Sequence, residues 1–432
     1  MNATKLANYT NVKAQELWQT LYLCAKEKPN RRFHALFDKV YRPDILAEAW
    51  KRVKRKKGSG GIDGQTIEKI VHDYGESKFL NELYLELKEN RFHPKPVRRV
   101  HIPKGDGNFR PLGIPTIKDR VVQMAVKMVI EPLYEADFQD CSYGFRPKRN
   151  AHQAIARIRK ASRKAYWVVD VDIKGYFDNI NQDKLMKLVE LRINDKRMLK
   201  LLRKWLKAGV MEDGHFRDSA TGVPQGGVIS PLLSNIYLNV MDSLWLKRFS
   251  HLGELIRYAD DFVIICKSKK DALESIGVLK GIMSKLDLTL STEKSRLVNI
   301  WDSTDGFDFL GLHHRKFRKL NKGGSEIHVM SHIPSRKAMK KMRSKIKDYT
   351  DKRSNLYLDI DELIKGLNRK LHGFRNYYLI SPIAQKWLNR IDWYVLERLC
   401  LFWNKKRNIR HKHSRIKDVI EMTKGKLVKV AQ

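Results

Sequence analysis

The sequence predicts an α+β fold, in which a mixed α/β region is followed by an all-helical C-terminal third. Three observations support this prediction. Between Val97 and Leu312, short β-branched runs alternate with helical stretches. Beyond residue 312, apolar residues recur at steps of three and four, as they do along one face of a helix. The last 120 residues also carry 31 Lys and Arg against 10 Asp and Glu, so the predicted helical part is strongly basic.

Length and charge narrow the classes of function. The 432 residues include 86 Lys and Arg against 48 Asp and Glu, a formal net charge of +38. The chain is long enough for two or three domains with a sizeable core. With 42% hydrophobic and 31% charged residues, it is neither a disordered basic tail nor a membrane protein. The charge indicates a nucleic-acid partner, although structural proteins of the ribosomal type share this property.

The four cysteines indicate a reducing compartment. Their spacing fits neither a metal site nor a redox motif, so we expect neither a disulfide framework nor a zinc finger. No apolar run approaches about 18 residues, and the N-terminus lacks the basic-then-apolar pattern of a signal peptide. We therefore expect no membrane partner and a location in the bacterial cytoplasm.

The elements before Val97 are predicted to be helical. Residues 1–30 are polar, have helical propensity and form an N-terminal extension. Residues 31–57 carry the apolar spacing of a further helix that ends in a basic run. The glycine-rich segment 58–64 then breaks this helix.

Two predicted β elements carry carboxylates. A buried strand ends in Asp170 and Asp172, which share one face because strand side chains alternate. Residues 257–266 have two apolar β-rich flanks around a polar tip, which predicts a hairpin with Asp260 and Asp261 at its turn. Each signal has a plainer alternative, because Asp-Asp pairs occur in surface turns and a strand-end Asp is often only a cap.

Carboxylates gathered in this way indicate a divalent cation. Adjacent negative charges are unfavourable unless a cation binds them. One of Asp170 and Asp172 could meet the two hairpin carboxylates across neighbouring strands. Three carboxylates from two strands suit Mg²⁺, a hard ion that prefers oxygen ligands and leaves room for phosphate oxygens and water. Two such ions about 4 Å apart can activate a 3′-hydroxyl and stabilise a leaving pyrophosphate, and Mn²⁺ is a substitute of the same charge.

A glycine-rich turn lies between the two carboxylate elements. In residues 221–235 the glycines allow close approach of a ligand, and Ser230-Pro231 predicts a helix N-cap followed by a first-turn proline. Such a turn is weak evidence alone. Its position between two acidic elements makes it a stronger indication of a ligand site.

The basic third shows three helical runs. Apolar positions in 338–349, 360–374 and 383–402 predict amphipathic helices with basic outer faces. The alternative is that these Lys and Arg form an ordinary solvated helix surface.

The order of these motifs resembles the palm of reverse transcriptases, and their details resemble the group II intron reverse transcriptase/maturase family. The similarity spans about Arg31 to Arg407. It rests on the strings Gly-Ser-Gly-Gly-Ile-Asp-Gly64, Val-Arg-Arg-Val-His-Ile-Pro-Lys104, Arg110-Pro-Leu-Gly-Ile-Pro-Thr116, Tyr143-Gly-Phe-Arg-Pro147, Pro-Gln-Gly-Gly227, Tyr-Ala-Asp-Asp261, Leu288-Thr-Leu-Ser-Thr-Glu-Lys294, Phe309-Leu-Gly-Leu312 and Leu371-His-Gly-Phe-Arg-Asn-Tyr-Tyr378.

The resemblance implies roles for the acidic residues. Asp172 matches the first metal-binding aspartate of the family, five residues before the aromatic Phe177, and Asp170 is then a structural neighbour. Asp260 and Asp261 match the other two metal ligands. Tyr258 matches the residue that supports the primer end.

The resemblance also implies a nucleotide site. Lys104 and Arg110 match residues that grip the triphosphate, with donors that suit phosphate oxygens. Gln225 matches the residue that lies against the incoming nucleotide, and Lys294 matches a lysine that approaches the pyrophosphate. Phe177 would exclude a 2′-hydroxyl by its bulk, so the substrates are expected to be dNTPs.

The family implies a right-hand polymerase with a thumb, or maturase X domain, that holds RNA. We expect an N-terminal extension at 1–30, fingers and palm at 31–312, a helical thumb at 313–407 and a short basic tail at 408–432. The tail is a candidate remnant of a DNA-binding segment, without the cysteine-containing HNH endonuclease that many family members append. Arg375, Lys405 and Lys406 are candidate phosphate contacts, whereas the periodic aromatic residues of this third either complete its core or stack on bases.

The expected partners are an RNA template, which is the encoding intron, a DNA primer or target, and dNTPs. Two alternatives remain open on the sequence. One is an RNA-binding splicing factor with an idle polymerase palm. The other is a bacterial reverse transcriptase of the defence or retron type, to which the long thumb and the match before Val97 are poor fits.

Overall fold

The computed structural model describes residues 11–103, 107, 109–212, 215–217, 221–293, 295–301, 305–320, 323–407 and 416–432. Two compact units make up the chain. The first comprises Met1–Ile158 with Val169–Arg296, and the second comprises Arg159–Val168 with Leu297–Gln432. Among the described residues, no helix is long and apolar enough to cross a membrane.

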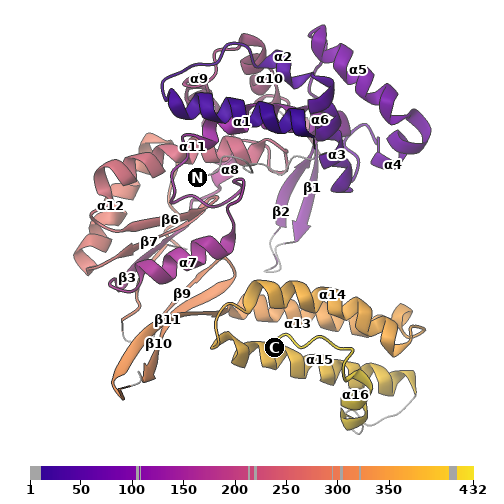
Figure 1. Ribbon diagram of the computed structural model, residues 1–432, viewed down its shortest axis with the longest axis vertical. Helices are drawn as coiled ribbons and strands as arrows, with labels where there is room; N and C mark the ends of the chain where they lie inside the picture. The colour runs from indigo at the N-terminus through magenta and orange to yellow at the C-terminus, as the bar shows by residue number, and fades with distance from the viewer. Residues whose placement is uncertain are drawn as a thin grey trace. The chain divides into compact units, whose positions relative to one another are not determined.

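The first unit begins with helices that surround α6 (Figure 1). Helix α6 is buried along most of its length, and α1 and α3 pack against it. Its N-terminus is capped by Thr116, whose side chain accepts a hydrogen bond from the Asp119 amide. Helices α1 (Val12–Glu27), α2 (Phe37–Val40) and α3 (Pro43–Arg55) pack against α6 (Ile117–Glu135), and α4 (Ile67–Lys69), a π-helical turn (Ile70–Tyr74) and α5 (Glu76–Lys88) follow α3 in the chain.

A small sheet of the first unit has the strand order β2-β1-β4-β5; β1 and β2 lie between α5 and α6 in the chain, and β4 and β5 follow α10 (Lys196–Leu206). Strands β1 and β2 are antiparallel, with Arg98 opposite Ile114 and Pro103 opposite Phe109. Strand β1 is parallel to β4. The bounds are β1 (Val97–Pro103), β2 (Phe109–Ile114), β4 (Val210–Glu212) and β5 (His215–Arg217).

A second group of neighbouring strands has the order β6-β7-β3 and contains the acidic motifs. Its central strand β7 is buried after its first residue, as expected of an apolar strand covered on both faces. Helix α11 is buried over most of its length, and a capping box of Ser268 and Asp271 starts α12. The bounds are β3 (Trp167–Val171), β6 (Glu254–Tyr258), β7 (Asp261–Cys266), α7 (Ala151–Ala161), α8 (Tyr176–Asn179), α9 (Gln182–Glu190), α10 (Lys196–Leu206), α11 (Ser230–Leu244), a further π-helical turn (Trp245–Phe249) and α12 (Lys269–Lys285).

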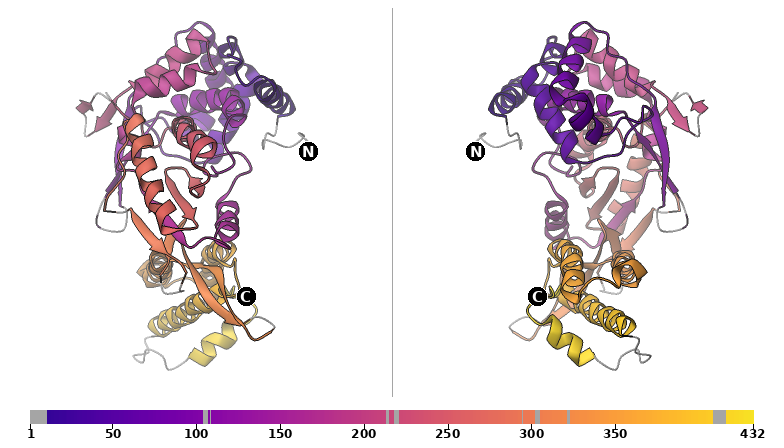
Figure 2. Two further views of the ribbon diagram at one scale, coloured as in Figure 1. Left: turned by 90° about the vertical axis from the view of Figure 1, so that its left-hand side faces the viewer. Right: turned by 90° about the vertical axis from the view of Figure 1, so that its right-hand side faces the viewer.

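In its described residues, the second unit combines a three-stranded sheet, in the order β11-β10-β9, with the helices α13 to α16. Strands β10 and β11 form a long antiparallel ribbon, drawn in orange in Figure 1 and Figure 2. The helices share an apolar core that includes Ile346, Leu367, Leu388 and Val395. The bounds are β8 (Arg296–Asn299), β9 (Phe307–Phe309), β10 (Leu312–Leu320), β11 (Glu326–Pro334), α13 (Arg336–Asp351), a 3₁₀ turn (Arg353–Asn355), α14 (Ile360–Tyr378), α15 (Ala384–Lys406) and α16 (Ile416–Thr423).

The α+β fold and the three C-terminal helices are confirmed, but the expectation of helical structure from residue 313 is wrong. Residues 312–320 and 326–334 form β10 and β11, and the helices begin only at Arg336. The interior of the ribbon holds polar side chains such as His314 and Lys316, so its strands show no apolar alternation in the sequence.

The C-terminal tail differs from the separate basic segment expected for 408–432. Val419 and Val430 are buried in the core of the second unit. The Val430 amide donates a hydrogen bond of 2.7 Å to Asp392, and the Val428 amide donates one of 3.0 Å to Asn368. The described part of the tail, residues 416–432, is therefore an integral part of this unit, whereas residues 408–415 lie outside the described part of the chain.

Candidate active site

The predicted acidic hairpin is formed by β6 and β7. Tyr258 lies opposite Asp261 in the ladder, so Ala259 and Asp260 form a two-residue turn. Ala259 has a φ of 61°, a left-handed conformation that is unfavourable for a residue with a Cβ atom. Such a conformation persists only where the surroundings hold it, and this occurs most often at functional sites.

Asp172 lies beside this turn, because it directly follows β3, the neighbour of β7. Burial raises the pKa of the Asp260 carboxyl above its usual value, and the negative charge of Asp172 raises it further. The positive charges of Arg110 and Arg257 act in the opposite direction. The structure therefore brings together Asp172, Asp260 and Arg110, which were all predicted to belong to one site.

These carboxylates fit a divalent cation. Asp260 is half-buried, and both its burial and the nearby Asp172 carboxylate raise its pKa, so its negative charge is unfavourable. A bound cation would stabilise that charge. Among the described residues, no three His, Cys, Asp or Glu side chains are gathered closely enough to form a ready-made metal site. Mg²⁺ does not require such a cage, because it usually takes one or two carboxylates and completes its shell with water and phosphate oxygens.

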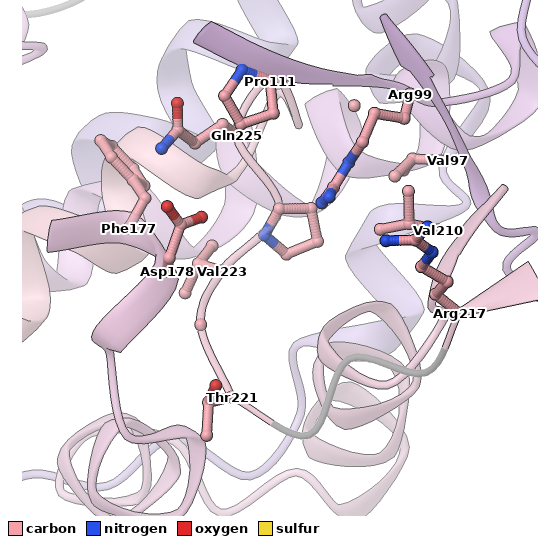
Figure 3. Close-up of a pocket in the computed structure, with 13 residues that line it drawn as sticks. Val97, Arg99, Pro111, Phe177, Asp178, Val210, Arg217, Thr221, Val223 and Gln225 are labelled. Carbon is pink, nitrogen blue, oxygen red and sulfur yellow. The ribbon is translucent and has the colours of Figure 1, made fainter. Parts of the chain in front are cut away.

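A pocket of about 420 Å³ contains two of the predicted nucleotide residues, Phe177 and Gln225. Figure 3 shows their side chains on one side of the pocket and Arg99 and Arg217 on the other. The remaining lining residues are Val97, Pro111, Gly113, Asp178, Val210, Thr221, Gly222, Val223 and Pro224. The pocket therefore offers an aromatic ring, an amide and two guanidinium groups to a ligand.

The glycine-rich loop that carries Gln225 is held on two sides. The Gly113 amide of β2 donates a hydrogen bond of 2.6 Å to the Gln225 carbonyl. The Val223 amide donates one of 2.8 Å to the Phe177 carbonyl, and a Cβ atom at Gly222 would lie 2.8 Å from that same oxygen. Gly222 also has a positive φ of 83°, so only glycine fits there without strain. This close approach fixes Gln225 relative to Phe177.

The other predicted residues are distributed as follows. Lys104 and Lys294 lie outside the described residues. Tyr258 is half-buried at the end of β6, beside the acidic turn. Asp170, expected to be a structural neighbour, forms an ion pair with Arg296 at 3.1 Å.

The candidate phosphate contacts of the second unit lie on its helices. Arg375 is half-buried on α14, whereas Lys405 and Lys406 are exposed at the end of α15. The Lys406 ammonium donates a hydrogen bond of 2.7 Å to the Leu358 carbonyl. Lys406 therefore has a structural contact that the sequence did not predict.

Sequence reasoning missed a buried group behind the acidic turn. Arg257 is fully buried and pairs with Asp242 of α11, which is also fully buried. Its only sequence signal is a charged residue inside an otherwise apolar strand, directly before Tyr258. Arg99 and Arg217 were also missed. Arg99 lies within the string that ends at Lys104 but was given no role, and no motif marks Arg217.

Two family models match the chain. The model described as "Reverse transcriptase (RNA-dependent DNA polymerase)" matches residues 102–314. The model described as "Group II intron, maturase-specific domain" matches residues 339–419. The first match contains the acidic turn and all of the pocket lining except Val97 and Arg99, and the second covers most of the helical part of the second unit.

Two bacterial proteins show the same similarity. Protein YkfC of Escherichia coli strain K12 is 38% identical, over 75% of this chain and 93% of its own length. The group II intron-encoded protein LtrA of Lactococcus lactis subsp. cremoris is 32% identical, over 87% of this chain and 75% of its own length. Among solved structures, a telomerase from Candida albicans with a fragment of telomeric RNA matches 78% of this chain and 63% of that chain, with a TM-score of 0.42 and 15% sequence identity.

Proposed function

Because the chain belongs to the family of group II intron reverse transcriptases and maturases, we propose that its acidic turn is the polymerase active site. Asp172, Asp260 and Asp261 would bind the catalytic ions, and the Phe177–Gln225 pocket would receive part of the incoming nucleotide. The observation that carries this proposal is the electrostatic coupling of Asp260 to both Asp172 and Arg110. This coupling links two predicted metal-binding residues, Asp172 and Asp260, to Arg110, which is predicted to bind the triphosphate.

Reverse transcriptases depend on divalent metal ions, and we propose Mg²⁺ as the ion here, with Mn²⁺ as a substitute. When bound, two such ions supply activation of the primer 3′-hydroxyl and neutralisation of the leaving pyrophosphate. The protein would present these carboxylates at the ends of neighbouring strands, where bound ions would draw them together. Burial of Asp260 limits the water that competes for its oxygens.

The residues around the acids would orient the substrate. The Arg110 guanidinium is exposed on β2, where its donors would meet phosphate oxygens. Lys104 and Lys294 would add positive charge to the same triphosphate. The Phe177 ring would fill the space that a 2′-hydroxyl requires and so select dNTPs, while Gln225 would lie against the nucleotide.

We propose that RNA is held by basic surfaces on both units. In the first unit, a groove along α10 is lined by Lys196, Lys200, Arg203, Lys204 and Lys207, together with His93, Pro94, Glu190 and Leu199. We call this surface the α10 groove. Its one acidic lining residue, Glu190, is already paired with Arg203 at 2.7 Å.

The second unit has a groove between α13 and α14. Its lining combines basic and aromatic side chains, which suit phosphates and stacked bases, with one carboxylate, Asp348. The residues that carry this chemistry are Lys341, Lys345, Tyr349, Lys352, Arg369, Lys370, Phe374, Tyr377 and Tyr378. With Arg375, Lys405 and Lys406 as further phosphate contacts, this surface would hold template, primer and the encoding intron as a thumb does.

The polymerase proposal is tested by Asp260→Ala. We expect primer extension with Mg²⁺ and dNTPs on an oligo(dT)–poly(rA) substrate to be abolished, while RNA affinity stays nearly unchanged, because the carboxylate serves ions rather than template. Undiminished dNTP incorporation would reject the site. A wild-type protein that binds RNA but extends no primer would instead favour the splicing factor with an idle palm.

The biological context is a separate part of the proposal. A self-splicing intron around the gene would support the intron RNA as the natural template, and its absence would favour the defence or retron type. The relatives from Escherichia coli and Lactococcus lactis support a bacterial protein, for which we propose the cytoplasm as the compartment.

A further inference from the structure

A fully buried guanidinium group lies directly behind the acidic turn. Arg257 of β6 donates a hydrogen bond of 2.8 Å from Nε to Asp242, and its Nη2 contacts the same carboxylate. Its Nη1 donates to the Asn235 side-chain oxygen at 2.9 Å and to the Ala259 carbonyl at 2.8 Å. One side chain thus connects helix α11 to the backbone of the turn.

The second half of this arrangement comes from the segment before α7. The Asn235 side-chain amide donates a hydrogen bond of 2.8 Å to the Gly144 carbonyl. A Cβ atom at Gly144 would lie 2.3 Å from the Ala259 nitrogen, so the two backbones are in direct contact. Asn235 therefore holds both Arg257 and Gly144, and each of these touches Ala259.

The same segment is also fixed along β6. The Arg257 amide donates to the Cys141 carbonyl at 2.8 Å, and the Tyr143 amide donates to the Arg257 carbonyl at 2.9 Å. The left-handed Ala259 is thereby held by a hydrogen bond to its carbonyl and by packing against its nitrogen. This is the kind of surrounding that an unfavourable φ requires.

Stability alone does not explain a buried ion pair at this position. Well-packed apolar residues can usually replace such a pair without loss of stability. An apolar side chain would offer no donor to the Ala259 carbonyl, however, and would leave the turn to relax. The group that Arg257 supplies is thus a fixed donor aimed at the residue before Asp260.

We propose that Arg257, Asn235 and Gly144 are positioning residues, which hold Ala259 so that Asp260 and Asp261 keep the placement needed to bind divalent cations together with Asp172. The inference rests on the proposed function of these three acids. None of the three positioning residues would touch an ion or a nucleotide. Their effect would be on the affinity for the metal.

Asn235→Leu is the variant of choice. Leucine has a similar shape but neither accepts from Arg257 nor donates to Gly144, while the pair of Arg257 with Asp242 is kept. Direct substitution of Arg257 would leave a buried carboxylate unpaired and endanger folding. Tyr237→Phe is the matched control, because it removes a buried hydrogen bond of 2.6 Å from the same helix to the Leu286 carbonyl, away from the turn.

Metal affinity is measured directly, by titrating the full-length protein with Mn²⁺ and following the free ion by electron paramagnetic resonance. Loss of a group that supports metal ligands typically costs about 10- to 100-fold in affinity, and we expect this range for Asn235→Leu. The Mg²⁺ midpoint for primer extension should rise in parallel, with activity partly restored at high Mg²⁺. Tyr237→Phe should bind Mn²⁺ as the wild type does.

A purely structural role would lower the melting temperature and the active fraction but leave the Mn²⁺ affinity unchanged, and this result would overturn the inference. If Asn235→Leu does not fold, Gly144→Ala is judged by the same Mn²⁺ titration, because its new methyl group would displace Ala259. A wrong assignment of the three acids would give a different result from a wrong assignment of the positioning residues. In the first case, Asp260→Ala itself would keep the Mn²⁺ affinity and the activity of the wild type.

Discussion

Replacing three lysines of the α10 groove should remove a defined share of the salt dependence of RNA binding. Lys200, Lys204 and Lys207 line the groove at helical spacing, on the face opposite the buried side of α10. The buried side is anchored independently, because the Trp205 indole donates a hydrogen bond of 3.0 Å to Asp119. The triple change Lys200→Ala, Lys204→Ala and Lys207→Ala should therefore leave the fold intact.

The expected magnitude follows from counterion release. Each lost phosphate contact reduces the slope of log affinity against log salt by about 0.7 to 0.9, so three contacts reduce it by about 2 to 3. Between about 50 and 200 mM salt, wild-type affinity should then fall about 20- to 40-fold more than the affinity of the variant. At low salt, the variant should bind RNA more weakly than the wild type.

The assay is filter binding of a structured RNA across that salt range. The matched control replaces Lys270, Lys280 and Lys285, which are exposed on α12 and change the net charge equally. A control slope equal to that of the wild type, with a reduced slope for the groove variant, is the expected pattern. An unchanged slope for the groove variant would refute the groove as an RNA contact, and equal reductions in both variants would indicate only a general charge effect.

Three further predictions concern the pocket and the second unit. Phe177→Ala should lower the ratio of kcat/KM for dNTP to kcat/KM for rNTP by about 10- to 200-fold, because the ring that would exclude a 2′-hydroxyl is removed. The ratio is measured by single-nucleotide extension, and an unchanged ratio would reject that role. Gly222→Ala should raise the KM for dNTP without changing RNA affinity, because the new Cβ atom would press on the Phe177 carbonyl. Equal losses of dNTP affinity and RNA affinity would indicate misfolding instead. Burial lowers the pKa of His314 to about 4 and of His332 to about 2, so both stay neutral in the fold at pH values where the unfolded chain takes up protons. This stability is therefore complete only above about pH 7.5, and it should fall by about 2 kcal/mol per histidine between about pH 7.5 and 5, or about 4 kcal/mol for the pair. Urea unfolding at the two pH values checks this. The double variant His314→Phe, His332→Leu should lose correspondingly less.

The sequence predicted the elements whose signals are local. The helices α13, α14 and α15 appear because their apolar residues repeat at helical spacing, and the β6–β7 hairpin appears because two apolar runs flank a polar tip. Alternation along one strand placed Asp170 and Asp172 on the same face, and the family resemblance selected Asp172 as the partner of Asp260. The motif resemblance is confirmed by the two family models and by the relatives that share them.

What the sequence did not predict depends on contacts between distant residues. The ribbon β10–β11 was missed because its interior is partly polar, with His314 and His332 joined by a hydrogen bond of 2.8 Å between their Nδ1 atoms. The role of Gly144 could not be read, because its partner Ala259 lies more than a hundred residues later. An alanine in a turn also gives no sign in the sequence that its φ is positive.

The two arginines near Asp260 show why a basic protein can concentrate acidic groups at one point. Arg257 and Arg110 both counter the rise in the pKa of Asp260 that burial and Asp172 produce. Arg257 is fully buried and bonded on all sides, so its charge stays in place whether or not substrate is bound. Arg110 is exposed, so its charge can be shared with an incoming triphosphate. Arg257 would then stabilise the ionised carboxylates when no substrate is bound. The effect of Arg110 on the same carboxylates would change when the nucleotide binds.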